Sequence, residues 1–171
     1  MLALAHDSGA TALDPALAET WCNRRYDFYA PPHQPVLPSV WGTIDVVATY
    51  AKIEGVYDAL RAAVKEPFAE VDLQLRMHFS HWYQWGTMIY ARFVVPDGGG
   101  GPEAVELHDR IWAEGLEAAF SAGGVMNDHH GVGLKLAPYM ERQHGASLEA
   151  MRRIKRALDP DGILNPGKLG L

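Results

Sequence analysis

The sequence predicts an α+β domain of the ferredoxin-like type, with an antiparallel sheet, helices on one face of it and further helices at the C-terminus. The main observation is the order of apolar patterns, which run strand, helix, strand, strand, helix and short strand. A second observation is that helical spacing returns twice after residue 137. At 171 residues, the chain is long enough to bury the core of one such domain.

Residues 1–40 are predicted to form an N-terminal arm that precedes this domain. A short helix is expected at Pro15–Trp21, because proline is well tolerated at the first position of a helix. Residues 21–29 are rich in aromatic side chains and arginine, and the four prolines within 31–38 favour an extended segment. Such an arm is expected to lie on another surface, either the rest of this domain or a second domain.

The domain at 41–171 is expected to begin with a β-branched strand at Trp41–Thr49. The next segment, at about 50–65, has apolar residues at three-to-four spacing and is predicted to be a helix that ends before Pro67. Glu70–His81 alternates between apolar and polar residues, and a second strand is expected at Gly86–Val95. The short connection between these two strands predicts a hairpin.

A glycine-rich linker separates the hairpin from a helix that starts at Pro102 and is terminated by the pair Gly123-Gly124. Val125-Met126 is expected to be a short strand. Two further helices are predicted, one starting at Pro138 and one capped by Ser147. The apolar residues expected to face inward from the last helix are Leu148, Met151, Ile154 and Leu158.

The composition excludes several classes of function. A net charge of −6 and a pI near 5.7 argue against nucleic-acid binding, which needs a basic surface. The single cysteine, Cys22, excludes an internal disulfide, and the absence of a long apolar run or signal peptide predicts a cytoplasmic protein without a membrane span. Residues 135–171 carry seven basic and four acidic side chains, which suits an anionic cofactor, an acidic partner surface or a solvated helix face.

The segment Gly123–Gly133 places His129 and His130 between two pairs of glycines. Glycine lets the backbone approach a ligand or another chain closely. Imidazole is the side chain whose unperturbed pKa lies nearest neutral pH, so this loop is a candidate for proton transfer. The alternative is a surface turn that happens to carry histidines.

Three segments resemble a known family of flavoenzymes. Asp-Pro-Asp-Gly-Ile-Leu-Asn-Pro-Gly-Lys-Leu at 159–169 resembles the C-terminal signature of FAD-linked oxidases of the vanillyl-alcohol oxidase superfamily. Thr87–Tyr90 and Gly123–Gly133 are similar to segments of its alkyldihydroxyacetonephosphate synthase branch. The resemblance covers about residues 40–171 and implies a substrate, or cap, domain whose C-terminal helices fold back onto the flavin. No counterpart of the FAD-binding domain is found, so FAD is expected to come mainly from a domain or subunit absent from this chain.

The resemblance also implies roles for particular residues. Tyr90 matches the catalytic tyrosine of that branch, which donates or accepts a proton. His129 and His130 match the second and third of three consecutive histidines, and Asp128, at the first position, is able to orient a neighbouring imidazole. In the tail, the resemblance places Asn165 and Lys168 near the flavin ring or its phosphates.

The expected activity is oxidoreduction at the flavin of a hydroxyl-bearing small molecule or lipid precursor. The substrate-binding arginine of the synthase branch corresponds to a position near Ala30-Pro31, where the sequence has no arginine. Arg24 or Arg25 is the nearest candidate to replace it. The isolated chain is expected to be inactive.

A second branch of the family, the D-2-hydroxy-acid dehydrogenases, binds a divalent metal through two strand histidines and an acid–histidine pair in the later loop. In this sequence the strand positions correspond to Tyr83 and Tyr90 and His129 replaces the acid, so only His130 is kept and no metal site is expected. A different cluster of His78 and His81 with the loop histidines is chemically conceivable for zinc. However, residues three apart on a strand point to opposite faces, which opposes joint ligation.

Two other functions stay open at the level of the sequence. One is a stand-alone ferredoxin-like module that binds a partner or forms a homodimer through an exposed apolar face, without catalysis. The other is a zinc hydrolase.

Overall fold

A computed structural model of the chain describes residues 2–27 and 39–171. Its contacts divide the chain into two units, residues 1–36 and 37–171, and each is described by itself. The first unit contains α1 (Leu2–Asp7), which the sequence analysis did not predict, and α2 (Ala16–Arg24), which follows Pro15 as predicted but extends beyond Trp21. The proline-rich part of the expected arm, with Ala30-Pro31, lies outside the described residues, and the domain boundary at residue 41 stays a prediction.

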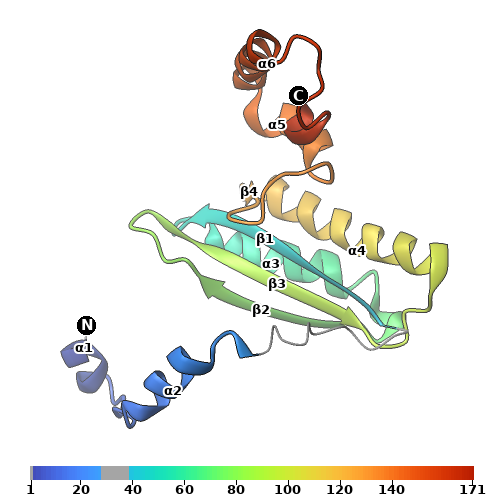
Figure 1. Cartoon of the computed structure of the whole chain (residues 1–171). Coiled ribbons are helices and arrows are strands. Elements are labelled where there is room, and N and C mark those ends of the chain that lie inside the picture. Colours follow the sequence, from blue (N-terminus) through green and yellow to red (C-terminus); the bar gives the residue numbers. More distant parts are fainter. Residues whose placement is uncertain (1, 28–38) are drawn as a thin grey trace. The chain divides into compact units, whose positions relative to one another are not determined.

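The second unit contains the predicted ferredoxin-like arrangement (Figure 1). Its four-stranded sheet has the order β2-β3-β1-β4, and every neighbouring pair is antiparallel. This is the strand order of a split βαβ fold, so the predicted α+β class is confirmed. The elements are β1 (Val40–Thr49), α3 (Ile53–Lys65), β2 (Gln74–Ser80), β3 (Gly86–Val95), α4 (Gly101–Ser121) and β4 (Val125–Met126).

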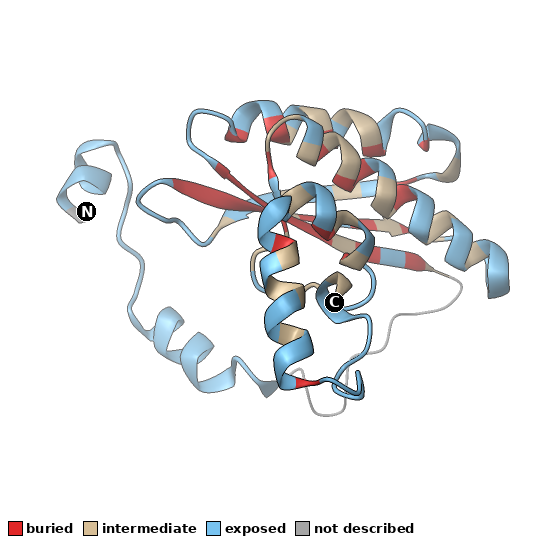
Figure 2. Cartoon of the chain, turned by 90° about the horizontal axis from the view of Figure 1, so that it is seen from above, coloured by how far each residue is buried: buried red, intermediate tan, exposed pale blue. Residues whose placement is uncertain are grey.

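Helices α3 and α4 cover one face of this sheet, and the core lies between them and the strands (Figures 1 and 2). Alternate residues of β1 and β3, such as Ile44 and Phe93, are almost completely buried there. Gly115 lets α4 approach β1 closely, because a Cβ at this position would lie 2.6 Å from Cδ1 of Ile44. The opposite face is left partly open to solvent, and the polar residues of β2 and β3 point from it.

The strand β2 is shorter than the predicted Glu70–His81. Ala69–Val71 forms a 3-10 turn, and Asp72 adopts a φ of 50°, so the strand begins only at Gln74. At its other end, a φ of 51° at His81 turns the chain out of the strand. The apolar alternation extends beyond the strand because Leu73 packs into the core from the turn.

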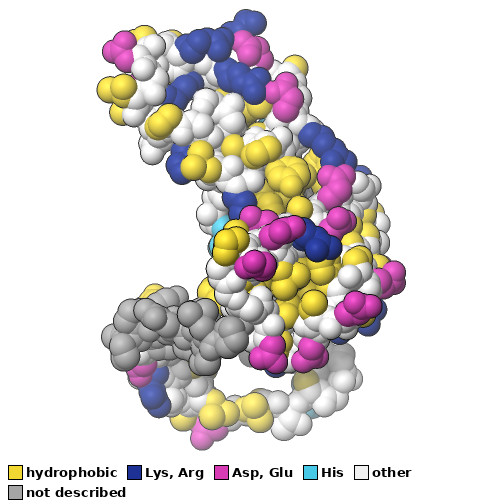
Figure 3. Space-filling model, turned by 90° about the vertical axis from the view of Figure 1, so that its right-hand side faces the viewer, with side chains coloured by type: hydrophobic (Ala, Val, Ile, Leu, Met, Phe, Trp, Pro, Cys, Tyr) yellow, Lys and Arg dark blue, Asp and Glu magenta, His cyan; other side chains and the backbone are white. Residues whose placement is uncertain are grey.

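The C-terminal segment forms the two predicted helices, as α5 (Met140–His144) and α6 (Ala146–Leu158). The predicted cap is wrong: Gly145 occupies the N-cap position of α6, and Ser147 lies inside the first turn. Leu148 is buried as predicted, but Ile154 and Leu158 are 60% and 77% exposed, because nothing within the described residues covers that side of the helix. Figure 3 shows basic side chains gathered at this end of the domain, with hydrophobic side chains exposed between them.

The helices in the described part of the chain are all too short or too polar to cross a membrane.

We expect Gly86→Ala to destabilise the domain by about 1–3 kcal/mol, because a Cβ at Gly86 would lie 2.1 Å from the carbonyl oxygen of Ala48. Gly55→Ala is the matched control. No atom lies within 4 Å of a Cβ built at this α3 position, so the same change should stabilise the helix by about 0.5–1 kcal/mol. Urea unfolding measures both values, and equal effects would contradict the packing described for β3.

Candidate functional site

The site is built around Asp45, a carboxylate in the middle of β1 that is only 7% exposed. Its side chain lies on the open face of the sheet, in register with Tyr90 on β3. The Oδ2 atom accepts a hydrogen bond from the backbone N–H of Asp128 at 2.7 Å and a longer one from that of His129 at 3.4 Å. The Oδ1 atom lies 2.7 Å from Nδ1 of His130. Asp45 therefore fixes both the backbone and one imidazole of the loop that follows β4.

The histidine loop is a tight turn with its own internal bonds. Asn127 has a φ of 67°, and its backbone N–H donates to the carbonyl oxygen of Asp45 at 2.9 Å. Its side-chain oxygen accepts the backbone N–H of His130 at 3.0 Å. Just before the turn, the backbone N–H of Met126 donates to Oε1 of Gln143 on α5 at 2.8 Å. The loop is thus held from the sheet and from the C-terminal helices.

Asp128 joins this loop to the connection between β2 and β3. Its Oδ2 atom lies 2.5 Å from Nδ1 of His81, and its Oδ1 atom accepts the hydroxyl of Tyr83 at 2.8 Å. Burial raises the pKa of the Asp128 carboxyl, but the hydrogen bonds from His81 and Tyr83 and the nearby imidazoles outweigh burial, so the net pKa is below the ordinary value. The pKa of Tyr83 is raised, first by its hydrogen bond to Asp128 and then by burial.

The rings of two tyrosines and four histidines follow one another across the open face. The ring centroid of Tyr90 lies 5.5 Å from that of His130 and 6.3 Å from that of His129. On one side of this group His78 packs against Tyr90 at 5.2 Å, and on the other His81 packs against His129 at 4.7 Å. Tyr83 continues the series beside His81 at 6.5 Å.

The structure therefore brings together the three residues predicted to be catalytic, Tyr90, His129 and His130, although their roles stay predictions. Asn165 and Lys168 are not joined to them: among the described residues, no hydrogen bond or ion pair links either side chain to the ring cluster. The tail reaches the end of the loop at a different point, where the backbone N–H of Leu169 donates to the carbonyl oxygen of Gly133 at 3.3 Å. The cofactor roles of Asn165 and Lys168 also stay predictions.

The sequence reasoning missed Asp45, and it separated His78 from His81. The sequence does contain a signal for Asp45, because it is a lone acid within a β-branched strand. A carboxylate is rarely buried unless it is paired, so such an acid indicates a polar partner nearby. The two histidines were expected on opposite faces, but the strand ends at Ser80 and the positive φ of His81 turns its ring to the same cluster.

His81, Asp128 and His129 form the one group of possible metal ligands found in the described ranges, with ligand atoms within 4.8 Å of one another. The separation of 2.5 Å between His81 and Asp128 suits a hydrogen bond. Ligands about 2.0 Å from a tetrahedral zinc lie farther apart than this. The expectation that the site holds no metal stays a prediction.

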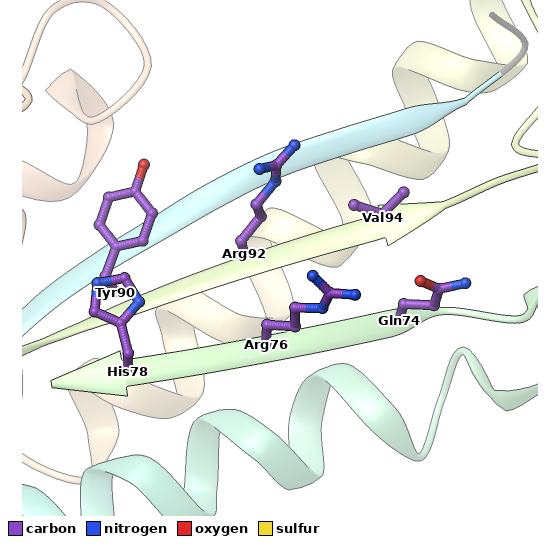
Figure 4. A pocket seen from close by; sticks show the side chains of 6 residues that line it. All are labelled: Gln74, Arg76, His78, Tyr90, Arg92 and Val94. Carbon is purple, nitrogen blue, oxygen red and sulfur yellow. The ribbon is translucent and has the colours of Figure 1, made fainter. Parts of the chain in front are cut away.

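A hollow of about 390 Å³ lies beside the ring cluster on the same face of the sheet. Figure 4 shows that its lining side chains project from β2 and β3, with Tyr90 and His78 at one end. They are Gln74, Arg76, His78, Tyr90, Arg92 and Val94.

Residues 3–169 match the family model described as the C-terminal domain of FAD linked oxidases. The chain belongs to this family. The match begins at residue 3, so it covers nearly the whole chain. The predicted membership in a family of FAD-linked oxidases is thereby confirmed.

Similar proteins include two alkyldihydroxyacetonephosphate synthases. That of Trypanosoma brucei brucei is 31% identical over 169 residues, covering 94% of this chain and 27% of the synthase. That of Dictyostelium discoideum is 27% identical over 170 residues, covering 95% of this chain and 27% of the synthase. An uncharacterized FAD-linked oxidoreductase of Escherichia coli (strain K12) is 27% identical over 166 residues, covering 92% of this chain and 34% of that protein.

A solved structure of an alkyldihydroxyacetonephosphate synthase shares the fold, with a TM-score of 0.55 at 17% sequence identity over 86% of this chain and 24% of that one. The chain thus spans between about a quarter and a third of the length of the relatives it matches. The family model and the Escherichia coli relative both carry names of FAD-linked oxidoreductases, so the family is established for this domain. The activity of a whole enzyme is a separate question.

We expect Asp45→Asn to destabilise the domain by about 1–3 kcal/mol, because an amide cannot accept from both the loop backbone and His130. Deuterium exchange should rise at the backbone amides of Asp128 and His129. Asp58→Asn is the matched control, since Asp58 is exposed on α3, and its effect should stay within about 0.5 kcal/mol. Unchanged exchange in the loop of Asp45→Asn would show that Asp45 does not anchor it.

The lowered pKa of Asp128 predicts a pH dependence of stability. Its contribution is complete above the unfolded-state carboxyl pKa of about 3.9 and is lost as the pH falls through the lower folded-state value. Asp128→Asn should therefore lower the free energy of unfolding by about 1 kcal/mol at neutral pH, and the difference from wild type should vanish in strong acid. Urea titrations across this range test the sign, and a difference that grows on acidification would contradict it.

Proposed function

We propose that this chain forms the substrate side of an FAD-dependent oxidoreductase that oxidises a hydroxyl-bearing small molecule or lipid precursor, with FAD held mainly by an FAD-binding domain or subunit. The observation that carries this proposal is the contact between Tyr90 and His130 on an open sheet face, with Asp45 hydrogen-bonded to Nδ1 of the imidazole. Family membership supports the flavin chemistry.

The residues present fit a flavin supplied from outside this fold. His129 and His130 have side chains 42% and 39% exposed, so their free edges face away from the domain's own core. Trp82 and Trp85, 68% and 55% exposed, add aromatic surface in the connection beside the site. In the tail, the amine of Lys168 has no ion-pair partner among the described residues and is available to a phosphate. When bound, FAD would accept the two electrons removed from the substrate.

The hydrogen bonds in the site support one direction of proton transfer. A carboxylate at Asp45 can only accept from Nδ1 of His130, so in the neutral imidazole Nδ1 carries the proton and Nε2 keeps a lone pair. This nitrogen is able to take the proton of a substrate hydroxyl as hydrogen leaves the adjacent carbon. The phenol of Tyr90, packed on the same imidazole, orients that hydroxyl or exchanges its proton.

The partner surface is proposed to include α6 and the tail. Ile154, Leu158, Ile163 and Leu164 are all more than half exposed. Exposed apolar side chains in such number are typical of a surface that another domain covers. A homodimer burying the same residues is the alternative. Size-exclusion chromatography separates the two, because a stable dimer of the isolated chain would favour the stand-alone module.

We expect Tyr90→Phe to lower turnover at least about a hundredfold in an enzyme reconstituted by co-expression with the FAD-binding region of a full-length relative. The hydroxyl is lost while the ring contacts are kept, so flavin retention and folding should be unchanged. Tyr57→Phe is the control, because Tyr57 lies on α3 and stacks on Phe79. The readout is flavin reduction by a panel of alcohols in the absence of oxygen. Equal rates for the two variants would exclude Tyr90 from the chemistry.

A further inference from the structure

Two arginines face each other across the hollow beside the ring cluster. The antiparallel register of β2 and β3 pairs Arg76 directly with Arg92. The neighbouring pair on one side is His78 with Tyr90, and on the other side it is Gln74 with Val94. All six side chains project from the same face and line one hollow (Figure 4). Two positive charges thus stand in register at its centre.

This cationic pair is not neutralised within the described part of the chain. Among the described residues no carboxylate forms an ion pair with Arg76 or Arg92, and the guanidinium of Arg92 lies over the ring of Trp41, 5.6 Å from its centroid. Like charges directly opposite each other on neighbouring strands destabilise a sheet. The arrangement is also unexpected in a chain of net charge −6. A bound anion would turn this repulsion into two charge-assisted interactions.

The nearby acids do not serve this purpose. Asp45 lies on the same face, one register position closer to the loop, but its oxygens are taken by His130 and the loop backbone. Asp128 is taken by His81 and Tyr83. The acidic groups of the site therefore bind the loop and its neighbours, and they do not pair with the guanidinium groups in the hollow.

We propose that the hollow between Arg76 and Arg92 binds an anionic end group of the substrate, a phosphate monoester or a carboxylate, while the substrate hydroxyl lies at Tyr90 and His130. This assignment rests on the function proposed above and adds the substrate class to it. Arginine presents a planar fork of donors that matches both anions. The two residues are specificity determinants rather than catalytic groups.

The strand spacing limits the substrate further. Arg92 and Tyr90 are two residues apart on β3, which separates their positions by about 7 Å. An anion at the arginines and a hydroxyl at Tyr90 must then be several bonds apart. A simple 2-hydroxy acid, with its hydroxyl and carboxylate on adjacent carbons, does not span this interval. The site suits a hydroxyl separated from the anionic group by a short chain.

The experiment is calorimetric titration of the full 171-residue chain at low salt with four probes. Glycerol 3-phosphate and 4-hydroxybutyrate carry the hydroxyl and the anion at a distance, lactate carries them on adjacent carbons, and inorganic phosphate has no second group. We expect saturable binding of the first two probes to be tighter than that of the last two. Which of the first two binds better distinguishes phosphate from carboxylate recognition.

Arg76→Gln and Arg92→Gln should each weaken binding about tenfold, the loss typical of one hydrogen bond to a charged group. Arg61→Gln, an exposed arginine on α3, removes the same charge and should change little. Arg76→Glu places an acid opposite Arg92, so it should abolish binding while raising the thermal midpoint, which excludes misfolding as the cause.

Several outcomes would overturn the proposal: no saturable binding, equal effects of Arg76→Gln and Arg61→Gln, or displacement of the probes by FAD, which would assign the hollow to the phosphates of the cofactor. Tighter binding of lactate than of glycerol 3-phosphate and 4-hydroxybutyrate would contradict the proposed separation between the anionic group and the hydroxyl. Because these titrations need no flavin, they are independent of turnover. If the reconstituted enzyme fails to reduce its flavin with any alcohol while the probes bind, the proposed function fails and the anion site stands.

Discussion

The buried carboxylate of Asp45 is the constraint on which the arrangement of the site depends. A charge taken out of water costs several kcal/mol unless hydrogen bonds replace its hydration. Asp45 receives these bonds from two loop amides and one imidazole, all contributed by residues more than eighty positions away in the chain. The loop must therefore close over the sheet for the strand to be stable. In this way the folding requirement of β1 fixes the position of His130 relative to Tyr90, and the geometry that we propose to be catalytic results from burial of one acid.

A second constraint is the one-sided packing of the sheet. Helices α3 and α4 bury one face with an apolar core, and the connection after β4 covers only one end of the other. The rest of that face keeps its polar side chains exposed. The outer side of α6 likewise exposes apolar side chains. A domain with these two surfaces is stable through its own core, yet the cluster of Tyr90 and the histidines faces outward. This is the arrangement that a substrate domain needs if another segment holds the cofactor.

The elements of the fold were largely predictable because their signals are local. The spacing that defines α3, α4 and β3 is set by which side chains face one core, and the observed elements agree with it closely. The start of β2 was not predictable, since Leu73 reaches the same core from a turn. The site was harder to predict from the sequence. The proximity of Tyr90 to the histidines followed from family resemblance, whereas the Asp45 contacts depend on strand register and loop closure. His81 shows the limit clearly, because a single positive φ reversed the side predicted for its ring.

The distribution of charge around the site follows from these contacts. The oxygens of both acids in the site are engaged in hydrogen bonds, those of Asp45 with His130 and a loop amide and those of Asp128 with His81 and Tyr83, so neither acid pairs with the arginines of the hollow. The two arginines, on strands with no acid opposite them, keep their full charge. A chain that is acidic overall therefore presents two exposed positive charges in register on the open face of its sheet. An anionic ligand would be drawn to these charges with its uncharged end toward Tyr90 and His130, the end at which the proposed chemistry occurs.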